Sequence, residues 1–189
     1  MQNDPFLEQD ESQETELNFK GFGPRLGAYL LDALFLIIPV GAVNIYNLIY
    51  LRSFWLYLLA SIVAMAYKPI LEWLYGATWG KMILYIKVVD YDGGKINAAQ
   101  AVLRSIFTIA QTLIMLPIYF YIFNDGYLAD FEGYFDYSLA LAERYPVLNV
   151  ISGISALIVF AEVIALLMDQ PYWRSIHDRI AKTYVVEKE

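Results

Sequence analysis

The stretch Phe22–Asp32, with the sequence FGPRLGAYLLD, decides the fold of this chain. It places Arg25 seven residues before Asp32 and continues after Asp32 as the apolar run ALFLIIPV. Seven residues make about two helical turns, so the two charged side chains lie on roughly the same face, about 10 Å apart along the axis. The stretch therefore predicts a transmembrane helix with a cation at its mouth and an acid inside it. An ionisable group inside a span is costly and is a candidate functional site by default.

The composition agrees with a membrane protein whose main partner is the lipid bilayer. Of 189 residues, 59% are hydrophobic and only 17% are charged, against about a quarter charged in an ordinary soluble domain. The chain has no cysteine and one histidine, His177, which argues against thiolate or multi-histidine metal sites. The net charge of −7 argues against nucleic acid. No nucleophile–base–orienter set is evident, so we expect neither enzyme activity nor a metal or other cofactor.

Four apolar runs approach the length of about 20 residues that a span requires. We predict an all-α polytopic fold with transmembrane helices at about 24–50, 53–75, 98–123 and 146–169. They form a single domain over 21–187, preceded by a disordered acidic tail over 1–20.

The orientation follows from Lys and Arg in the short loops. If the N-terminus is cytosolic, ten of these residues fall on or near the cytosolic side, and only Arg52 and Arg144 fall outside. This bias predicts that both termini are cytosolic.

Segments between and after the spans predict smaller elements. The β-branched run 86–90 followed by Asp92-Gly93-Gly94 indicates a strand and a turn. It can pair with the β-rich run 183–186 in a small cytosolic β element. The apolar spacing in 127–145 and 171–182 predicts amphipathic interfacial helices on the outer and inner surfaces. Plain packing of both segments against the bundle is the alternative.

Each span also carries one charged residue at a similar depth. Asp32 is seven residues into the first span, Lys68 is seven before the end of the second, Arg104 is six into the third, and Glu162 is seven before the end of the fourth. At 1.5 Å per residue, all four lie roughly 10 Å below the cytosolic interface. Facing pairs in this intramembrane charged layer can neutralise one another. Three alternatives stay open: a purely structural layer, a proton- or cation-binding layer, and a docking surface for a partner's span.

Local pairs compete with that layer. Glu72 lies four residues after Lys68, so these two can pair within one helix and leave Asp32 to Arg104. Asp178 has Arg174 and Lys182 four residues to either side, which predicts intrahelical ion pairs beside His177.

The stretch 76–81, GATWGK, is one residue too short for a phosphate-binding loop, and Met82 follows its lysine. We expect a tight turn in which Gly80 permits close backbone approach and Lys81 lies at the lipid headgroups.

Taken together, these motifs resemble the RDD family of membrane proteins, which is named for one arginine and two aspartates. Arg25 and Asp32 match the first motif and Asp178 the second aspartate; the other matching positions are Ala28, Leu31, Gly76, Thr78, Gly80, Lys81, 88–93, Arg104, His177, Thr183, Val185 and Val186. The chain departs from the pattern in having leucine at the apolar position 31, where isoleucine is common, in Tyr184 inside the closing motif, and in a long acidic outer loop over 124–145.

The resemblance implies a multi-span protein, which we expect in the bacterial plasma membrane. It also implies either of two functions. The first is transport of an ion, such as a proton or cation, or of a small solute. In this reading Asp32 binds the proton or cation, Arg25 and Arg104 tune its pKa, and Asp178 lies at the cytosolic entrance. The second is a non-catalytic subunit of a larger membrane complex, with a membrane-protein partner or a second copy.

Overall fold

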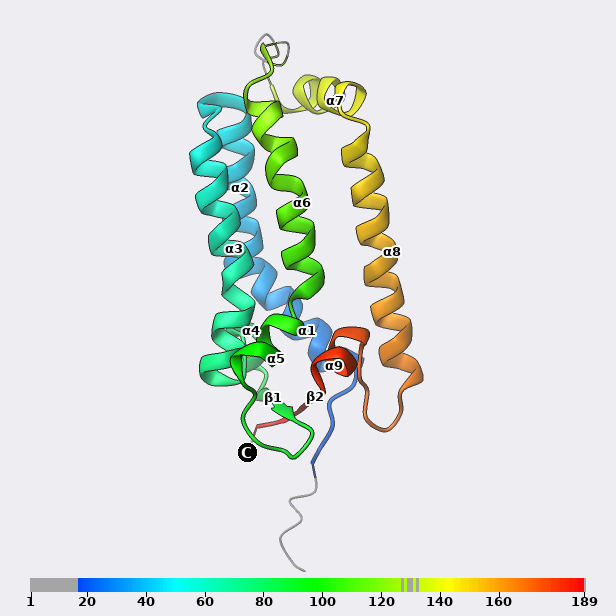
Figure 1. Cartoon of the computed structure of the whole chain (residues 1–189). Helices are drawn as coiled ribbons and strands as arrows, with labels where there is room; N and C mark the ends of the chain where they lie inside the picture. The colour runs from blue at the N-terminus through cyan, green and yellow to red at the C-terminus, as the bar shows by residue number, and fades with distance from the viewer. Residues whose placement is uncertain (1–16, 127, 129–130, 132, 189) are drawn as a thin grey trace, which may run out of the picture.

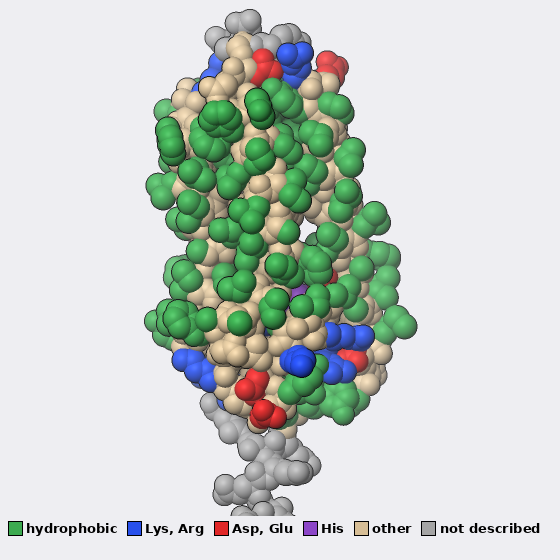
Figure 2. Space-filling view, viewed as in Figure 1, with side chains coloured by type: hydrophobic (Ala, Val, Ile, Leu, Met, Phe, Trp, Pro, Cys, Tyr) green, Lys and Arg blue, Asp and Glu red, His purple; other side chains and the backbone are tan. Residues whose placement is uncertain are grey.

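The computed structural model describes residues 17–126, 128, 131 and 133–188. Four of its helices are long and apolar enough to span a membrane, at Phe22–Leu51, Phe54–Tyr75, Ile106–Phe123 and Val147–Met168. They stand side by side as a bundle, with the two strands at one end and α7 (Tyr134–Arg144) across the other (Figure 1). Apolar side chains cover the flank of the bundle and charged side chains gather at its two ends (Figure 2). The predicted class of fold is confirmed: this is an integral membrane protein with four spans and a small antiparallel sheet.

The first span is one continuous helical path made of α1 (Phe22–Asp32), a π-helical turn (Ala33–Ile37), α2 (Ile38–Tyr46) and a second π-helical turn (Asn47–Leu51). It continues through Pro39, which lies near the start of α2. The turn into α3 (Phe54–Tyr75) is held by the buried Asn47, which bonds both the backbone N–H and the carbonyl of Ser53. The first two spans therefore form a helical hairpin that is closed by one amide side chain.

The third span differs from the prediction of one helix over 98–123. It is divided into α5 (Ala98–Leu103) and α6 (Ile106–Phe123), with Arg104 and Ser105 in the turn between them. A capping box between Asn97 and Gln100 starts α5. The break frees Arg104 from a helical interior and lets its guanidinium reach three other segments.

The short elements gather at one end of the bundle, which we call the sheet end. They are α4 (Trp79–Ile83), β1 (Ile86–Asp90), α5, α9 (Ile176–Ala181) and β2 (Thr183–Glu187). The strands pair antiparallel with Val88 opposite Val185, which confirms the predicted β element. Their buried side chains share a core with Ala28, Ile96 and Ala101. Residues 1–16 of the predicted tail lie outside the described residues, whereas Phe19 bridges to Val186 and Lys20 donates its N–H to the carbonyl of Val185.

The opposite end carries α7 (Tyr134–Arg144), which leads into α8 (Val147–Met168). Tyr137 and Ala140 turn inward and pack with Ile122 and Leu128, whereas Phe135 on the other side is 80% exposed. The predicted outer amphipathic helix is thus present over the second part of 127–145, and the inner one is the shorter α9.

Candidate functional site

A cavity of about 460 Å³ opens at the sheet end among all four spans. The surface of the molecule is hollowed on the side of α8 (Figure 2). The four residues of the predicted charged layer all line this cavity, which brings them together as the depth count predicted. Its charged and histidine lining residues are Arg25, Asp32, Lys68, Lys81, Arg104, Glu162 and His177.

Arg104 is the centre of a buried ion-pair network. Its Nε donates to Glu72 Oε2 at 2.8 Å, and its Nη1 donates to Asp178 Oδ1 and, at 2.5 Å, to Thr183 Oγ1. Both carboxylates are fully buried and Arg104 is nearly so. Because Glu72 is on α3, Asp178 on α9 and Thr183 on β2, one guanidinium ties the second span to two elements that follow the fourth.

Two further cations complete the network. Arg25 Nη1 donates to Asp178 Oδ2 at 2.5 Å, and Lys81 Nζ donates to Glu72 Oε1 at 2.5 Å. The order is Arg25, Asp178, Arg104, Glu72, Lys81, so three cations share two carboxylates and the network carries one positive charge. Lys81 is therefore paired inside the protein rather than placed at the headgroups, as the sequence had led us to expect.

The surroundings shift the pKa values of network members outside the spans. Burial by itself raises the pKa of Asp178, but Arg104 and Arg25 hold that pKa well below its usual range. Burial lowers the pKa of Lys81 to about 8, although Glu72 opposes the shift. Burial also disfavours the charged form of Arg104, but Glu72 and Asp178 raise its pKa above the ordinary value. Arg104 and Asp178 are therefore both charged at neutral pH.

At the cavity, Lys68 has no carboxylate partner among the described residues, and one N–H group of Arg25 is left over after its pairing with Asp178. Lys68 Nζ donates to the backbone carbonyl of Arg104 at 2.9 Å, and none of the ion pairs among the described residues includes Lys68. Arg25 Nη2 is buried and has no hydrogen-bond partner within the part of the chain that the structure describes. The local alternative, a Lys68–Glu72 pair, is wrong because Glu72 is occupied by Arg104 and Lys81.

Asp32 is satisfied by three uncharged donors. Its Oδ1 accepts from Tyr67 Oη and from the Gly80 N–H, and its Oδ2 accepts from Thr78 Oγ1, all at 2.7 Å. Gly80 is where α4 touches α1, because a Cβ there would overlap the carbonyl oxygen of Ala28. Asp32 therefore fastens the first span to α3 and α4.

Glu162 pairs with α9 instead of with another span. Its Oε2 lies 2.8 Å from His177 Nδ1, and its Oε1 accepts the His177 N–H at 3.2 Å. Burial and the nearby Lys68 lower the pKa of His177, against the attraction of Asp178 and Glu162. His177 is thus mainly neutral at pH 7, and the contact fixes α9 against α8.

The sequence named most of these residues but not their pairing. Among the described residues, no ion pair joins any two of Asp32, Lys68, Arg104 and Glu162. The predicted partners of Asp178 were Arg174 and Lys182, but Arg174 bonds Asp169 instead. Tyr67 and Ser175 were missed as site residues. The Ser-x-x-Asp spacing before α9 was the one available signal for Ser175, because this spacing is typical of a helix N-cap.

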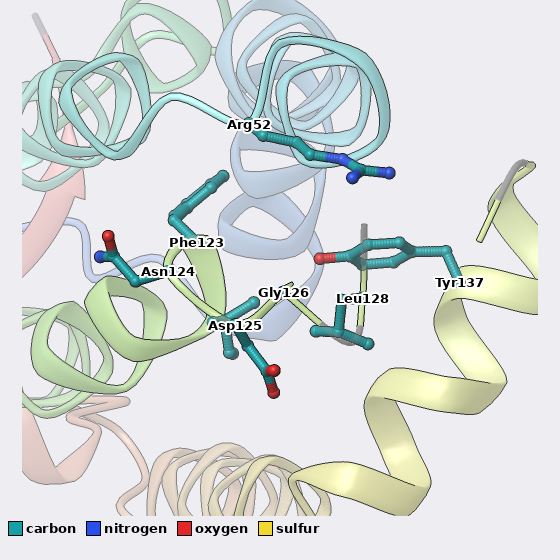
Figure 3. A pocket seen from close by; sticks show the side chains of 8 residues that line it. Arg52, Phe123, Asn124, Asp125, Gly126, Leu128 and Tyr137 are labelled. Carbon is teal, nitrogen blue, oxygen red and sulfur yellow. The ribbon is translucent and has the colours of Figure 1, made fainter. Parts of the chain in front are cut away.

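A second cavity, of about 130 Å³, lies at the α7 end (Figure 3). Arg52, Asp125 and Tyr137 approach it from the first hairpin, the loop after α6 and α7 (Figure 3). Arg52 Nη2 donates to the Phe131 carbonyl, and Tyr145 Oη donates to Asp125 Oδ2 at 2.8 Å. These contacts position α7 and the loop before it.

Fold and site together define a class: a polytopic membrane protein in which four spans and a two-stranded sheet enclose a charged cavity. Within that class, the chain belongs to the RDD family, whose model matches residues 19–182. The match includes all four spans and all five charged residues of the network, whereas Thr183 lies one residue beyond it. No curated protein and no solved structure matches the chain.

Proposed function

We propose that this protein transports a small solute across the membrane and that the cavity at the sheet end is the solute's binding site. The observation that carries the proposal is that one cavity of about 460 Å³ touches all four spans and presents donors without a charged partner among the described residues. Its size is within the range of about 300–1,000 Å³ that is usual for ligand sites. Because every span contributes to its wall, a small tilt of any span changes access to it.

The contacts favour an anionic solute over a proton or metal cation. A cation needs carboxylate oxygens, but Asp32 already accepts three hydrogen bonds and Glu162 is bonded to His177. Lys68 and Arg25 Nη2, in contrast, offer N–H groups that lack a charged acceptor in the described part of the chain. Ammonium and guanidinium groups in such a position bind carboxylate and phosphate oxygens. This assigns Lys68 and Arg25 to binding, and Asp32 to holding the first span in place.

We place the sheet end in the cytosol, and the protein in the plasma membrane of a bacterium. The excess of Lys and Arg at the sheet end, with Arg52 and Arg144 at the other, supports this orientation through the positive-inside bias. The solute is then bound from the cytosolic side.

The test is flux in reconstituted vesicles, with three probes: a pH gradient with Na⁺ or K⁺, inorganic phosphate, and lysophosphatidic acid. We expect protein-dependent flux with an anionic probe. Lys68→Gln is expected to slow it about tenfold, the loss expected from one charged hydrogen bond. Lys95→Gln, at an exposed position in the turn after β1, is the matched control and is expected to change the rate less than twofold.

Two outcomes contradict the proposal. Vesicles with protein that match protein-free vesicles for all three probes refute transport. Cation–proton exchange that Lys68→Gln leaves unchanged refutes the preference for an anionic solute. Asp32 would then be the residue that binds the proton or cation.

The second candidate function is that of a subunit in a membrane complex. It is favoured by the side opening of the cavity beside α8, which a partner's span can cover. Native mass spectrometry of protein extracted in a mild detergent distinguishes the two functions, because a stoichiometric partner chain is expected only for a subunit. A lipid-bound monomer that supports flux in vesicles favours the transporter.

A further inference from the structure

We infer that the ligand of the cavity is an anionic amphiphile, a lipid whose phosphate headgroup binds between Lys68 and Arg25 and whose acyl chain leaves sideways between α1 and α8. The inference rests on the proposed function for the location of the site and adds the chemical class of the ligand.

The walls of the cavity are the first reason. Apart from the charged residues at its floor, the lining side chains are mainly apolar or aromatic, and they come from α1, α6 and α8. A hydrophilic ion gains nothing from such walls, whereas an acyl chain is stabilised by burial against them. The main apolar residues are Leu26, Tyr29, Phe107, Ile158, Val159 and Leu166.

The direction of the opening is the second reason. Tyr29 on α1 is 60% exposed and Val159 on α8 is 62% exposed, yet both line the cavity. Both belong to spans, so the surface on which they are exposed is the one that faces lipid. We therefore place the mouth of the cavity between them, where it opens toward the bilayer and a lipid can enter it without crossing the aqueous phase.

The position of the charges is the third reason. Arg25 is three residues after the start of α1 at Phe22, and Lys68 is seven residues before the end of α3 at Tyr75. At 1.5 Å per residue these positions are about 5 and 10 Å from the sheet-end termini of their helices. A headgroup at the interface therefore meets Arg25 first and Lys68 deeper. Because both residues line the same cavity, their charges can draw an anionic headgroup below the interface.

Binding is measured with the whole protein in nanodiscs of phosphatidylcholine. The probe is lysophosphatidic acid with a photoactivatable group in its acyl chain, and mass spectrometry locates the label. Lysophosphatidylcholine with the same chain and inorganic phosphate compete separately. We expect label on α1 and α8 at the cavity, weak competition by lysophosphatidylcholine and none by millimolar phosphate.

Two pairs of variants test the two halves of the ligand. Lys68→Gln is expected to weaken binding at least about tenfold, which corresponds to about 1.4 kcal/mol, whereas Lys68→Arg retains most of it. Val159→Trp fills the mouth and is expected to abolish labelling. Val150→Trp is its control, because Val150 is on the same helix, is 59% exposed and does not line the cavity.

Equal labelling in Val159→Trp and the parent protein overturns the side entrance. Competition by phosphate as strong as that by unlabelled lysophosphatidic acid overturns the amphiphile in favour of a soluble oxyanion. Lipid binding without flux of any probe keeps this ligand and refutes transport. Flux of phosphate without lipid binding keeps transport and refutes this ligand. The failure of the proposed function and the failure of this inference are therefore distinguishable.

Discussion

Gly80→Ala is expected to be among the most damaging single-methyl additions in this protein. The new Cβ would overlap the carbonyl oxygen of Ala28 and approach Asp32 Cγ to 3.0 Å. Neither neighbour is the flexible end of a long side chain, so α4 must move away from α1. That movement stretches the 2.7 Å hydrogen bond from the Gly80 N–H to Asp32 Oδ1.

The magnitude follows from two contributions. Overpacking of a tight contact costs about 1–3 kcal/mol, and a hydrogen bond to a carboxylate contributes about 1.5–3 kcal/mol. We therefore expect the free energy of unfolding to fall by roughly 3–5 kcal/mol. Gly153→Ala on α8 is the matched control, because a Cβ at that position would meet no heavy atom of the described residues within 4 Å. Loss of a glycine from a helix interior is expected to stabilise that variant by about 0.5–1 kcal/mol.

The measurement is reversible unfolding in mixed micelles with a rising fraction of dodecyl sulfate, followed by far-ultraviolet circular dichroism. Both variants are compared with the parent protein at one pH and lipid content. If Gly80→Ala loses less than about 1 kcal/mol, the low end of an overpacking cost, then α1 and α4 are not in the close contact described above. The assigned role of Asp32 as a fastening point would fall with it.

Three other predictions follow from the network and the orientation. Asp178→Asn leaves Arg25 without a carboxylate and is expected to lower the free energy of unfolding by about 3–5 kcal/mol. The control Asp169→Asn is expected to lower it by less than about 1 kcal/mol, because the partners of Asp169 are more exposed. Similar losses for the two variants in the same unfolding assay would contradict a buried network. Because the pKa of His177 is lowered in the folded protein, the unfolded chain binds the proton more tightly. The contribution of neutral His177 to the free energy of unfolding is therefore fully present above about pH 6.5 and is lost as the pH drops toward the folded pKa. Unfolding measured at pH 7.5 and 5.5 should show this loss in the parent protein and not in His177→Gln, since the chain has one histidine. In the cysteine-free chain, Lys95→Cys and Asp136→Cys should react with a membrane-impermeant maleimide from opposite sides, only the second in intact cells; the reverse pattern would invert the orientation.

The spans and the sheet could be predicted because their signals are local. Apolar runs of sufficient length mark the four spans, and β-branched runs mark β1 and β2. The break between α5 and α6 carries no such signal, since the sequence around Arg104 and Ser105 has neither glycine nor proline. It is fixed by the contacts of the Arg104 guanidinium with residues that are far away in the chain.

Part of the cavity lining was predictable from the sequence, but the pairing of its charges was not. A depth count places Asp32, Lys68, Arg104 and Glu162 at one level, and they do line one cavity. Which carboxylate meets which cation depends on α9 and β2, and a depth count along the spans says nothing of elements outside them. The predicted charged layer offered Asp32 or Glu162 as a carboxylate partner for Arg104. In the structure Asp178, 74 residues after Arg104, is such a partner instead.

The long reach of the network has a consequence for biogenesis. Arg25 and its carboxylate Asp178 are separated by 153 positions, and all four spans lie between or beside them. During synthesis Arg25 enters the bilayer long before Asp178 exists, and Thr183 is made later still. The network can close only after the last span has been inserted in the correct direction. A closed network therefore requires complete insertion, and a chain with a misplaced fourth span leaves Arg25 without its carboxylate.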